Sequence, residues 1–229
     1  MPRLISFRFD DGHIRGAQKA AALLAPDRAS FFLVSGRLTG EAPDLAAMID
    51  AGDDFGTLDQ WRSMAAQGQD VQPHSVTHAN LRRLAPELVA AEVEGSLALI
   101  RQIHAGPYVF CHPYNALTDL DLAALGLDAA GFHTPNSERQ VQFNRLDGHL
   151  DLYRLRSWAV REPHFDDIVS QLDTRVPDES WTILAFHSLD GEGHEPWTSD
   201  GFARLVGAVR GLGYQIASIG AVVGRLNRP

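Results

Sequence analysis

The chain has 229 residues, of which 45% are hydrophobic, and a formal net charge of −9 at pH 7. This length is enough for one domain with a substantial core, and we expect residues 1–229 to form a single domain. The acidic balance argues against nucleic acid and anionic membrane surfaces as partners and favours a neutral substrate.

Cys111 is the only cysteine, so no internal disulfide can form and an oxidising compartment is not required. No apolar run approaches the ~20 residues of a membrane-spanning helix. The first expected strand begins within a few residues of Met1, which leaves no room for a signal peptide. We therefore expect a cytoplasmic protein without a membrane partner.

The first expected strand, residues 4–9, alternates apolar and polar side chains and ends at Asp10, Asp11 and Gly12. Neighbouring strand residues point to opposite faces, so both carboxylates can face one site only if the strand breaks there. Gly12 allows such a break. Two acids at this position suggest chemistry, and the alternative is that Asp10 or Asp11 caps the next helix.

Strands and helices then alternate along most of the chain, which predicts parallel strands joined by crossover helices in an α/β barrel or open sheet. Thr57 and Gln60 form a capping box, and Pro86 begins the clearest amphipathic helix. Strands are expected at 29–34, near 71, at 108–111, 128–132, within 152–160, at 181–186 and 214–217. Helices are expected at 16–24, 44–50, 58–67, from 86, and at 117–125, 165–172, 202–209 and 221–226. Loops are expected at 36–43, 134–148 and 190–197.

His74 and His78 follow an expected strand and are separated by three residues. On a helical turn, residues i and i+4 share a face, so both imidazoles can reach one ion. Two histidines with Asp10 or Asp11 make a three-ligand set with open positions, as catalytic metals require. The alternative is two unrelated histidines, one capping and one exposed.

Four motifs in this order, Phe9-Asp10-Asp11-Gly12, His74-Ser75-x-x-His78, Pro113-Tyr114 and the strand-end His187, resemble the polysaccharide deacetylases. This family is also known as the NodB-homology or carbohydrate esterase family 4 proteins. The resemblance extends from about Ile5 to the last expected helix. It implies one catalytic domain with a distorted (β/α) barrel of about seven parallel strands and outer helices. It also implies metal-dependent removal of acetyl groups from N-acetylated sugars.

The resemblance also implies a role for each matching residue. Asp10 corresponds to the general base and His187 to the general acid. The metal is divalent, with zinc expected first and cobalt, nickel or manganese also compatible with nitrogen and oxygen ligands. The ligands are then Asp11, His74 and His78, the backbone N–H of Tyr114 binds the oxyanion, and Trp158, Pro113 and Asn115 line the substrate site.

Cys111 departs from the family pattern, because many members have an arginine there that pairs with the general base. Arg8, Arg156 or Arg161 could substitute for it. We expect Cys111 itself to pack as a small hydrophobe, the alternative being a position close to the metal.

The glycine-rich loop 190–197 could cover the cleft, with Glu192 and Glu195 solvated. Tryptophans are mostly core residues, so we expect Trp181 in the core, while Trp61 and Trp197 could also stack on sugar rings.

Three functions are therefore open. The first is deacetylation of an N-acetylated sugar, and the second is hydrolysis of a small cyclic amide or imide at the same site. The third is a metal-binding or sugar-binding protein without turnover, which the missing arginine suggests.

Overall fold

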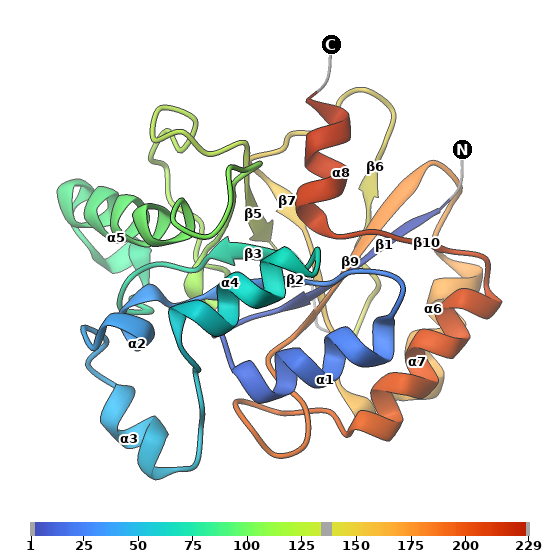
Figure 1. Cartoon of the computed structure of the whole chain (residues 1–229). Helices are drawn as coiled ribbons and strands as arrows, with labels where there is room; N and C mark the ends of the chain where they lie inside the picture. The colour runs from blue at the N-terminus through green and yellow to red at the C-terminus, as the bar shows by residue number, and fades with distance from the viewer. Residues whose placement is uncertain (1–2, 134–138, 228–229) are drawn as a thin grey trace.

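The strand β1, Leu4–Phe9, lies within a mostly parallel sheet (Figure 1). The structure is a computed structural model that describes residues 3–133 and 139–227. The strand β1 pairs in parallel with β2, β9 and β10, so three segments far apart in the sequence meet along it. The other members of this sheet are β3 and β8, which are parallel, and β6, which runs antiparallel to β9. The bounds are β2 Ser30–Leu33, β3 Asp70–Pro73, β6 Asn144–Arg145, β8 Trp158–Ala159, β9 Ser180–Phe186 and β10 Gln215–Ile216.

A second parallel sheet consists of β4 (Val109–Cys111), β5 (Ala129–His133) and β7 (Leu155–Arg156). Among the described residues, no strand of this sheet pairs with a strand of the first sheet. Side-chain hydrogen bonds connect the two sheets instead. The amide of Gln72 in β3 donates to the carbonyl of Pro107 and accepts from the N–H of Val109. The fold is thus the α/β class with parallel strands and outer helices that the sequence predicts.

Helices surround the sheets (Figure 1). All of them except the short helices α2 and α3 have buried apolar side chains. The capping box predicted at the start of α4 is present, because the side chains of Thr57 and Gln60 each accept from the other's backbone N–H. Within the described ranges, no helix has the length and apolar character needed to cross a membrane. The bounds are α1 Ile14–Leu24, α2 Ser35–Thr39, α3 Leu45–Asp50, α4 Leu58–Ala66, α5 Pro86–Ile100, α6 Phe165–Thr174, α7 Ser199–Gly211 and α8 Ile219–Leu226.

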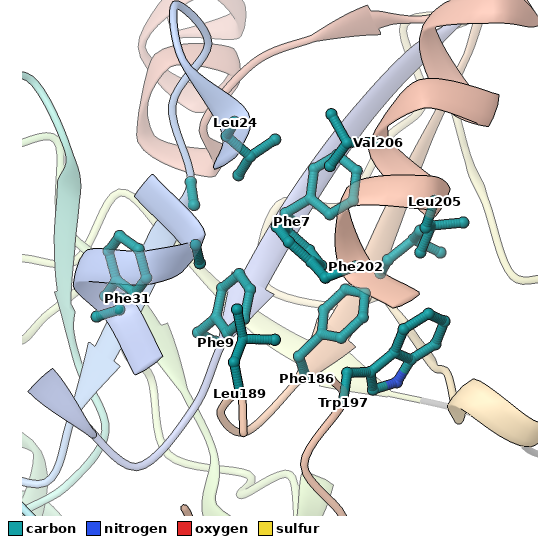
Figure 2. Packing of buried hydrophobic residues seen from close by; sticks show 14 of the residues in the cluster. Phe7, Phe9, Leu24, Phe31, Phe186, Leu189, Trp197, Phe202, Leu205 and Val206 are labelled. Carbon is teal, nitrogen blue, oxygen red and sulfur yellow. The ribbon is translucent and has the colours of Figure 1, made fainter. Parts of the chain in front are cut away.

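Aromatic side chains fill the core between β1, β9 and the helices α1 and α7 (Figure 2). Phe7 and Phe9 of β1 both meet Phe202 of α7 edge-on, with ring centroids 5.5 and 5.4 Å apart. Such pairs each add about 0.5–1.5 kcal/mol to the free energy of unfolding beyond area burial. This rigid packing fixes the end of β1, where the two carboxylates follow.

Two element predictions are wrong. Residues 36–43 are not all loop, since α2 covers the first part of this range. Residues 117–125 form turns instead of a helix: the side chains of Thr118 and Asp121 accept hydrogen bonds from backbone N–H groups two and three residues on. These local bonds compete with helix formation.

Two further predictions hold only in part: the strand expected within residues 152–160 and the loop expected at residues 134–148. The range 152–160 contains two short strands, β7 and β8. Within 134–148, residues 134–138 lie outside the described part of the chain, and β6 pairs with β9.

Glu192 is buried, which contradicts its predicted solvation. Its carboxylate accepts hydrogen bonds from the backbone N–H groups of Gly16 and Asp54, from the hydroxyl of Ser188 and from Arg15. The glycine-rich loop is therefore fastened to the start of α1 and to the segment before α4. Glu195 is exposed, as predicted.

Candidate metal centre and active site

The strand β1 breaks directly at the paired carboxylates. Asp11 has φ 75° and Gly12 has φ 81°, both left-handed, so the chain turns before α1 begins. The N-cap of α1 is His13, whose side chain makes no capping hydrogen bond. The alternative in which Asp10 or Asp11 caps the helix is therefore wrong, and both carboxylates remain available for a site.

His74 and His78 come from the loop after β3, and this loop is not the helical turn that their spacing suggested. Ser75 (φ 67°) and His78 (φ 58°) adopt left-handed conformations. The hydroxyl of Ser75 accepts from the backbone N–H of His78 at 3.0 Å. This irregular loop brings the two rings within 5.1 Å of each other, centroid to centroid.

The carboxylate of Asp11 faces both histidines. Its Oδ1 lies 3.2 Å from Nε2 of His78 and 3.6 Å from Nε2 of His74. This oxygen is buried and has no hydrogen-bond partner, so it is an acceptor directed at two ring nitrogens. A buried orphan oxygen beside two imidazoles is the donor set expected for a divalent cation.

The protonation states also suit a cation. Nδ1 of His74 lies 2.8 Å from the carbonyl of Cys111, so the ring proton belongs there and Nε2 keeps its lone pair. Burial lowers the pKa of His74 to about 4 and lowers the pKa of His78 as well. Burial alone would raise the pKa of Asp11, but His78, His74 and Arg37 outweigh it and hold that pKa below its usual range. At neutral pH all three groups are in their metal-binding forms.

Two charged residues that the sequence did not indicate support these ligands. Arg37 of α2 is buried; it donates to the backbone carbonyl of Asp11 at 3.2 Å and pairs with Asp44 at 2.9 Å. Glu92 of α5 accepts hydrogen bonds from Val76 and Thr77, between the two histidines. Nothing in the residue pattern links either side chain to a loop so distant in the sequence.

Asp10 is paired with Arg8, one of the three arginines that could substitute for the family arginine missing at position 111. The guanidinium donates to both carboxylate oxygens, with Nε 2.7 Å from Oδ1 and Nη2 in a very short contact with Oδ2. Burial alone would raise the pKa of Asp10, but Arg8 outweighs it and keeps this pKa below its usual range. Arg156 is exposed, and Arg161 pairs with Glu195 at 2.7 Å.

The turn Pro113–Asn115 places an exposed aromatic ring beside the histidines. Tyr114 and Asn115 have φ 58° and 51°, and the ring of Tyr114, 66% exposed, lies 4.8 Å from the ring of His78. Pro113 is buried, and Oδ1 of Asn115 lies 3.4 Å from Nη2 of Arg8. A cavity of about 570 Å³ opens beside Asn115 and is also lined by His112, Arg82, Tyr153 and Arg154.

His187 follows β9 directly and is half-buried. The register pairs Phe9 with Phe186, so Asp10 and His187 leave neighbouring strands side by side. His187 also contributes, as the smallest of the named causes, to the lowered pKa values of Asp10 and Asp11. Its ring contacts that of His194, 5.2 Å away in the glycine-rich loop.

Trp158 is 1% exposed and packs in the core, where it lines a cavity of about 350 Å³ together with Val160 and Arg161. Trp181 is in the core, as predicted. Trp61 and Trp197 are also buried, and their indole N–H groups donate to the carbonyls of Phe55 and Val160. The suggestion that either stacks on a sugar is therefore wrong, whereas the ring of Tyr114 is exposed to solvent beside the site.

A comparison with protein families finds a match between residues 2–130 and the model described as polysaccharide deacetylase, which is more than half of the chain. No curated protein matches the sequence.

Among solved structures, the peptidoglycan deacetylase PdaC from Bacillus subtilis aligns with 16% identity and a TM-score of 0.60, covering 98% of this chain and 91% of its own. The Xyl-CE4 domain of a multidomain xylanase from the hindgut metagenome of Trinervitermes trinervoides aligns with 14% identity, a TM-score of 0.63 and the same coverages. BA3943 from Bacillus anthracis, described as a CE4 family pseudoenzyme, aligns with 12% identity and a TM-score of 0.60, covering 97% of this chain and 66% of its own. These likenesses establish the shared fold.

Proposed function

The chain belongs to the polysaccharide deacetylase family, and from that premise we propose that it is a metal-dependent hydrolase that removes acetyl groups from N-acetylated sugars. The observation that carries this proposal is the convergence of Asp11, His74 and His78 beside a second carboxylate, Asp10. Because solved relatives align over 98% of this chain, we further propose that residues 1–229 form one catalytic domain.

Asp11, His74 and His78 would hold the metal, which leaves coordination positions free for substrate and solvent. Zinc is our first choice, with cobalt, nickel and manganese compatible with the same ligands. When bound, the metal would polarise the amide carbonyl and make the attacking water more acidic.

Asp10 would accept the proton of the attacking water. Its pairing with Arg8 keeps it anionic and oriented, and a positioned general base typically contributes about 10²–10⁴ in rate. The backbone N–H of Tyr114 would donate to the oxyanion, a contact worth about 10²–10³ in comparable sites. His187 would protonate the departing amine, which leaves poorly without a proton.

The substrate would lie over the exposed face of Tyr114 and extend toward the cavity beside Asn115. The polar side chains around that cavity suit a hydroxyl-rich molecule, and its volume of about 570 Å³ exceeds that of an acetyl group. Pro113 and Asn115 would then line the substrate site. Trp158, the third residue predicted to line the site, is 1% exposed and packs in the core.

The direct test is acetate release from N-acetylated chitooligosaccharides by the zinc-loaded protein, compared with Asp11→Asn. We expect acetate from the wild type and none from the variant. A cyclic imide assayed in parallel identifies the small-molecule hydrolase if it alone is hydrolysed. Bound metal without turnover of either substrate would contradict the enzyme proposal and indicate a non-catalytic binding protein.

A further inference from the structure

Among the residues that the structure describes, two overlapping sets of potential metal ligands share His74. One set is Asp11, His74 and His78, and the other is Asp10, His74 and Cys111. In each set the potential ligand atoms lie within 4.8 Å of one another. Both sets combine a carboxylate with an imidazole, and a thiolate is itself a strong zinc ligand. Ligand chemistry alone therefore does not decide which set takes a cation.

Arg8 distinguishes the two sets because it already engages the second one. Its guanidinium binds both oxygens of Asp10 in a two-point contact. Oδ1 of Asp11 has no hydrogen-bond partner, and the nearest guanidinium nitrogen, Nη1 of Arg37, lies 3.6 Å away as a longer ion pair. Residues i and i+2 of an extended segment share a face, so Arg8 of β1 can pair with Asp10, which directly follows the strand. Bidentate arginine–carboxylate pairs are short and geometrically specific, and this one is buried.

The surroundings of Arg8 hold the guanidinium in this position. Nη1 donates to the hydroxyl of Ser157 at 2.8 Å, and Nη2 lies 3.4 Å from Oδ1 of Asn115. The ring of Phe132 lies 4.6 Å from the guanidinium carbon, at cation–π distance. Three separate chain segments thus hold the positively charged guanidinium of Arg8 beside Asp10, where the second ligand set would bind a metal ion.

We propose that Arg8 is a positioning residue that selects the metal ligands: by occupying both oxygens of Asp10 it confines the metal to Asp11, His74 and His78. Asp10 then stays outside the coordination shell, where it is free to accept a proton. This inference rests on the proposed metal-dependent function. According to this inference, Arg8 determines which of the two adjacent carboxylates, Asp10 or Asp11, binds the metal.

Removing Arg8 would leave Asp10 buried without a positive partner, which is strongly unfavourable. A divalent cation would supply the missing charge. The thiol of Cys111, whose Sγ lies 3.8 Å from Oδ1 of Asp10, could then also coordinate after losing its proton to solvent. We therefore expect the variant Arg8→Met to recruit the second ligand set.

Cobalt-substituted protein tests this directly, because a thiolate ligand adds an intense near-ultraviolet charge-transfer absorption to Co²⁺. We expect the wild type to bind one Co²⁺ without this absorption. Arg8→Met should show it, and Arg8→Met with Cys111→Ser should lose it again. Arg156→Met removes an exposed arginine and should leave the wild-type spectrum unchanged.

If Arg8→Met does not fold, as judged by near-ultraviolet circular dichroism, the exchange Arg8→Ser with Cys111→Arg tests the same idea. It moves the guanidinium to a neighbouring position that also faces Asp10. Because this variant has no thiol, the readout is the visible Co²⁺ ligand-field spectrum, which reports coordination number and geometry and should match that of the wild type. Identical spectra for wild type and Arg8→Met, a thiolate absorption in the wild type, or an altered spectrum in a folded exchange variant would overturn the inference. Failure of the wild type to bind Co²⁺ would instead contradict the proposed function.

Discussion

Glu92 holds Thr77 by two hydrogen bonds: its Oε2 accepts from the backbone N–H at 2.8 Å and its Oε1 from the hydroxyl at 2.6 Å. The same Oε2 accepts from the N–H of Val76 at 2.9 Å. Because these residues lie between His74 and His78, one carboxylate on α5 fixes the loop that presents both imidazoles.

Replacing Glu92 with Gln should weaken metal binding. The amide oxygen can still accept from both backbone N–H groups, but the neutral side chain loses the charge-assisted strength of these bonds, and the Thr77 hydroxyl must turn from donor to acceptor. Changes to such supporting contacts cost about 10–100-fold in metal affinity. Zinc titration of the variant measures the loss. Glu94→Gln, an exposed position on the same helix, is the matched control and should bind zinc like the wild type; equal affinity in both variants would exclude the role of Glu92.

Asp10→Asn should retain the metal and lose turnover. Asparagine is nearly isosteric with aspartate but cannot accept a proton as a base, so we expect kcat to fall by about 10²–10⁴. Metal content by elemental analysis should stay at one equivalent. Asp11→Asn should lose metal and turnover together, and undiminished kcat in Asp10→Asn would remove Asp10 from the role of base.

The metal-free protein should lose stability as the pH falls from 6.5 toward 4. Burial lowers the pKa of His112 to about 4, while Nδ1 lies 3.0 Å from the carbonyl of Gly131. The unfolded state binds a proton near pH 6.5, so it gains protons before the native state does and stability decreases with falling pH. For His112 alone the expected loss between pH 7 and pH 5 is about 2 kcal/mol.

Urea unfolding in the presence of a chelator measures this loss. His112→Asn retains a donor for the carbonyl of Gly131 but does not titrate in this range, so its loss between pH 7 and pH 5 should be smaller by about 2 kcal/mol. An unchanged loss in the variant would show that His112 does not contribute to the pH dependence.

Two glycines within helices should respond oppositely to alanine. A Cβ at Gly16 of α1 would lie 2.9 Å from the backbone nitrogen of Leu189, so Gly16→Ala should destabilise the protein by about 1–3 kcal/mol. A Cβ at Gly207 of α7 meets open space, so Gly207→Ala should stabilise it by about 0.5–1 kcal/mol through helix propensity. Thermal unfolding of both variants checks the signs, and stabilisation by Gly16→Ala would contradict the close packing of α1 on the loop after β9.

The strands and most helices could be predicted from the sequence because their signals are local. The alternation in residues 4–9 and the capping box at Thr57 need no distant contact, and both were confirmed. The predicted helix at 117–125 was wrong because Thr118 and Asp121 bond to nearby backbone N–H groups, which apolar periodicity does not report.

The site was harder to predict wherever it depends on tertiary contacts. The spacing of His74 and His78 suggested a shared site, but the loop is irregular and depends on Glu92, a partner on another element. Arg8 was only one of three candidates to pair with Asp10. Its position two residues before Asp10 puts both side chains on one face, but the sequence does not show the distant contacts, such as that with Ser157, that hold the guanidinium.

The most direct test of the account is the position of the metal itself. A crystal of zinc-loaded protein, measured on both sides of the zinc absorption edge, should give one anomalous peak within bonding distance of Oδ1 of Asp11 and Nε2 of His74 and His78. A peak between Asp10 and Cys111, or zinc elsewhere with these three side chains unliganded, would contradict the account.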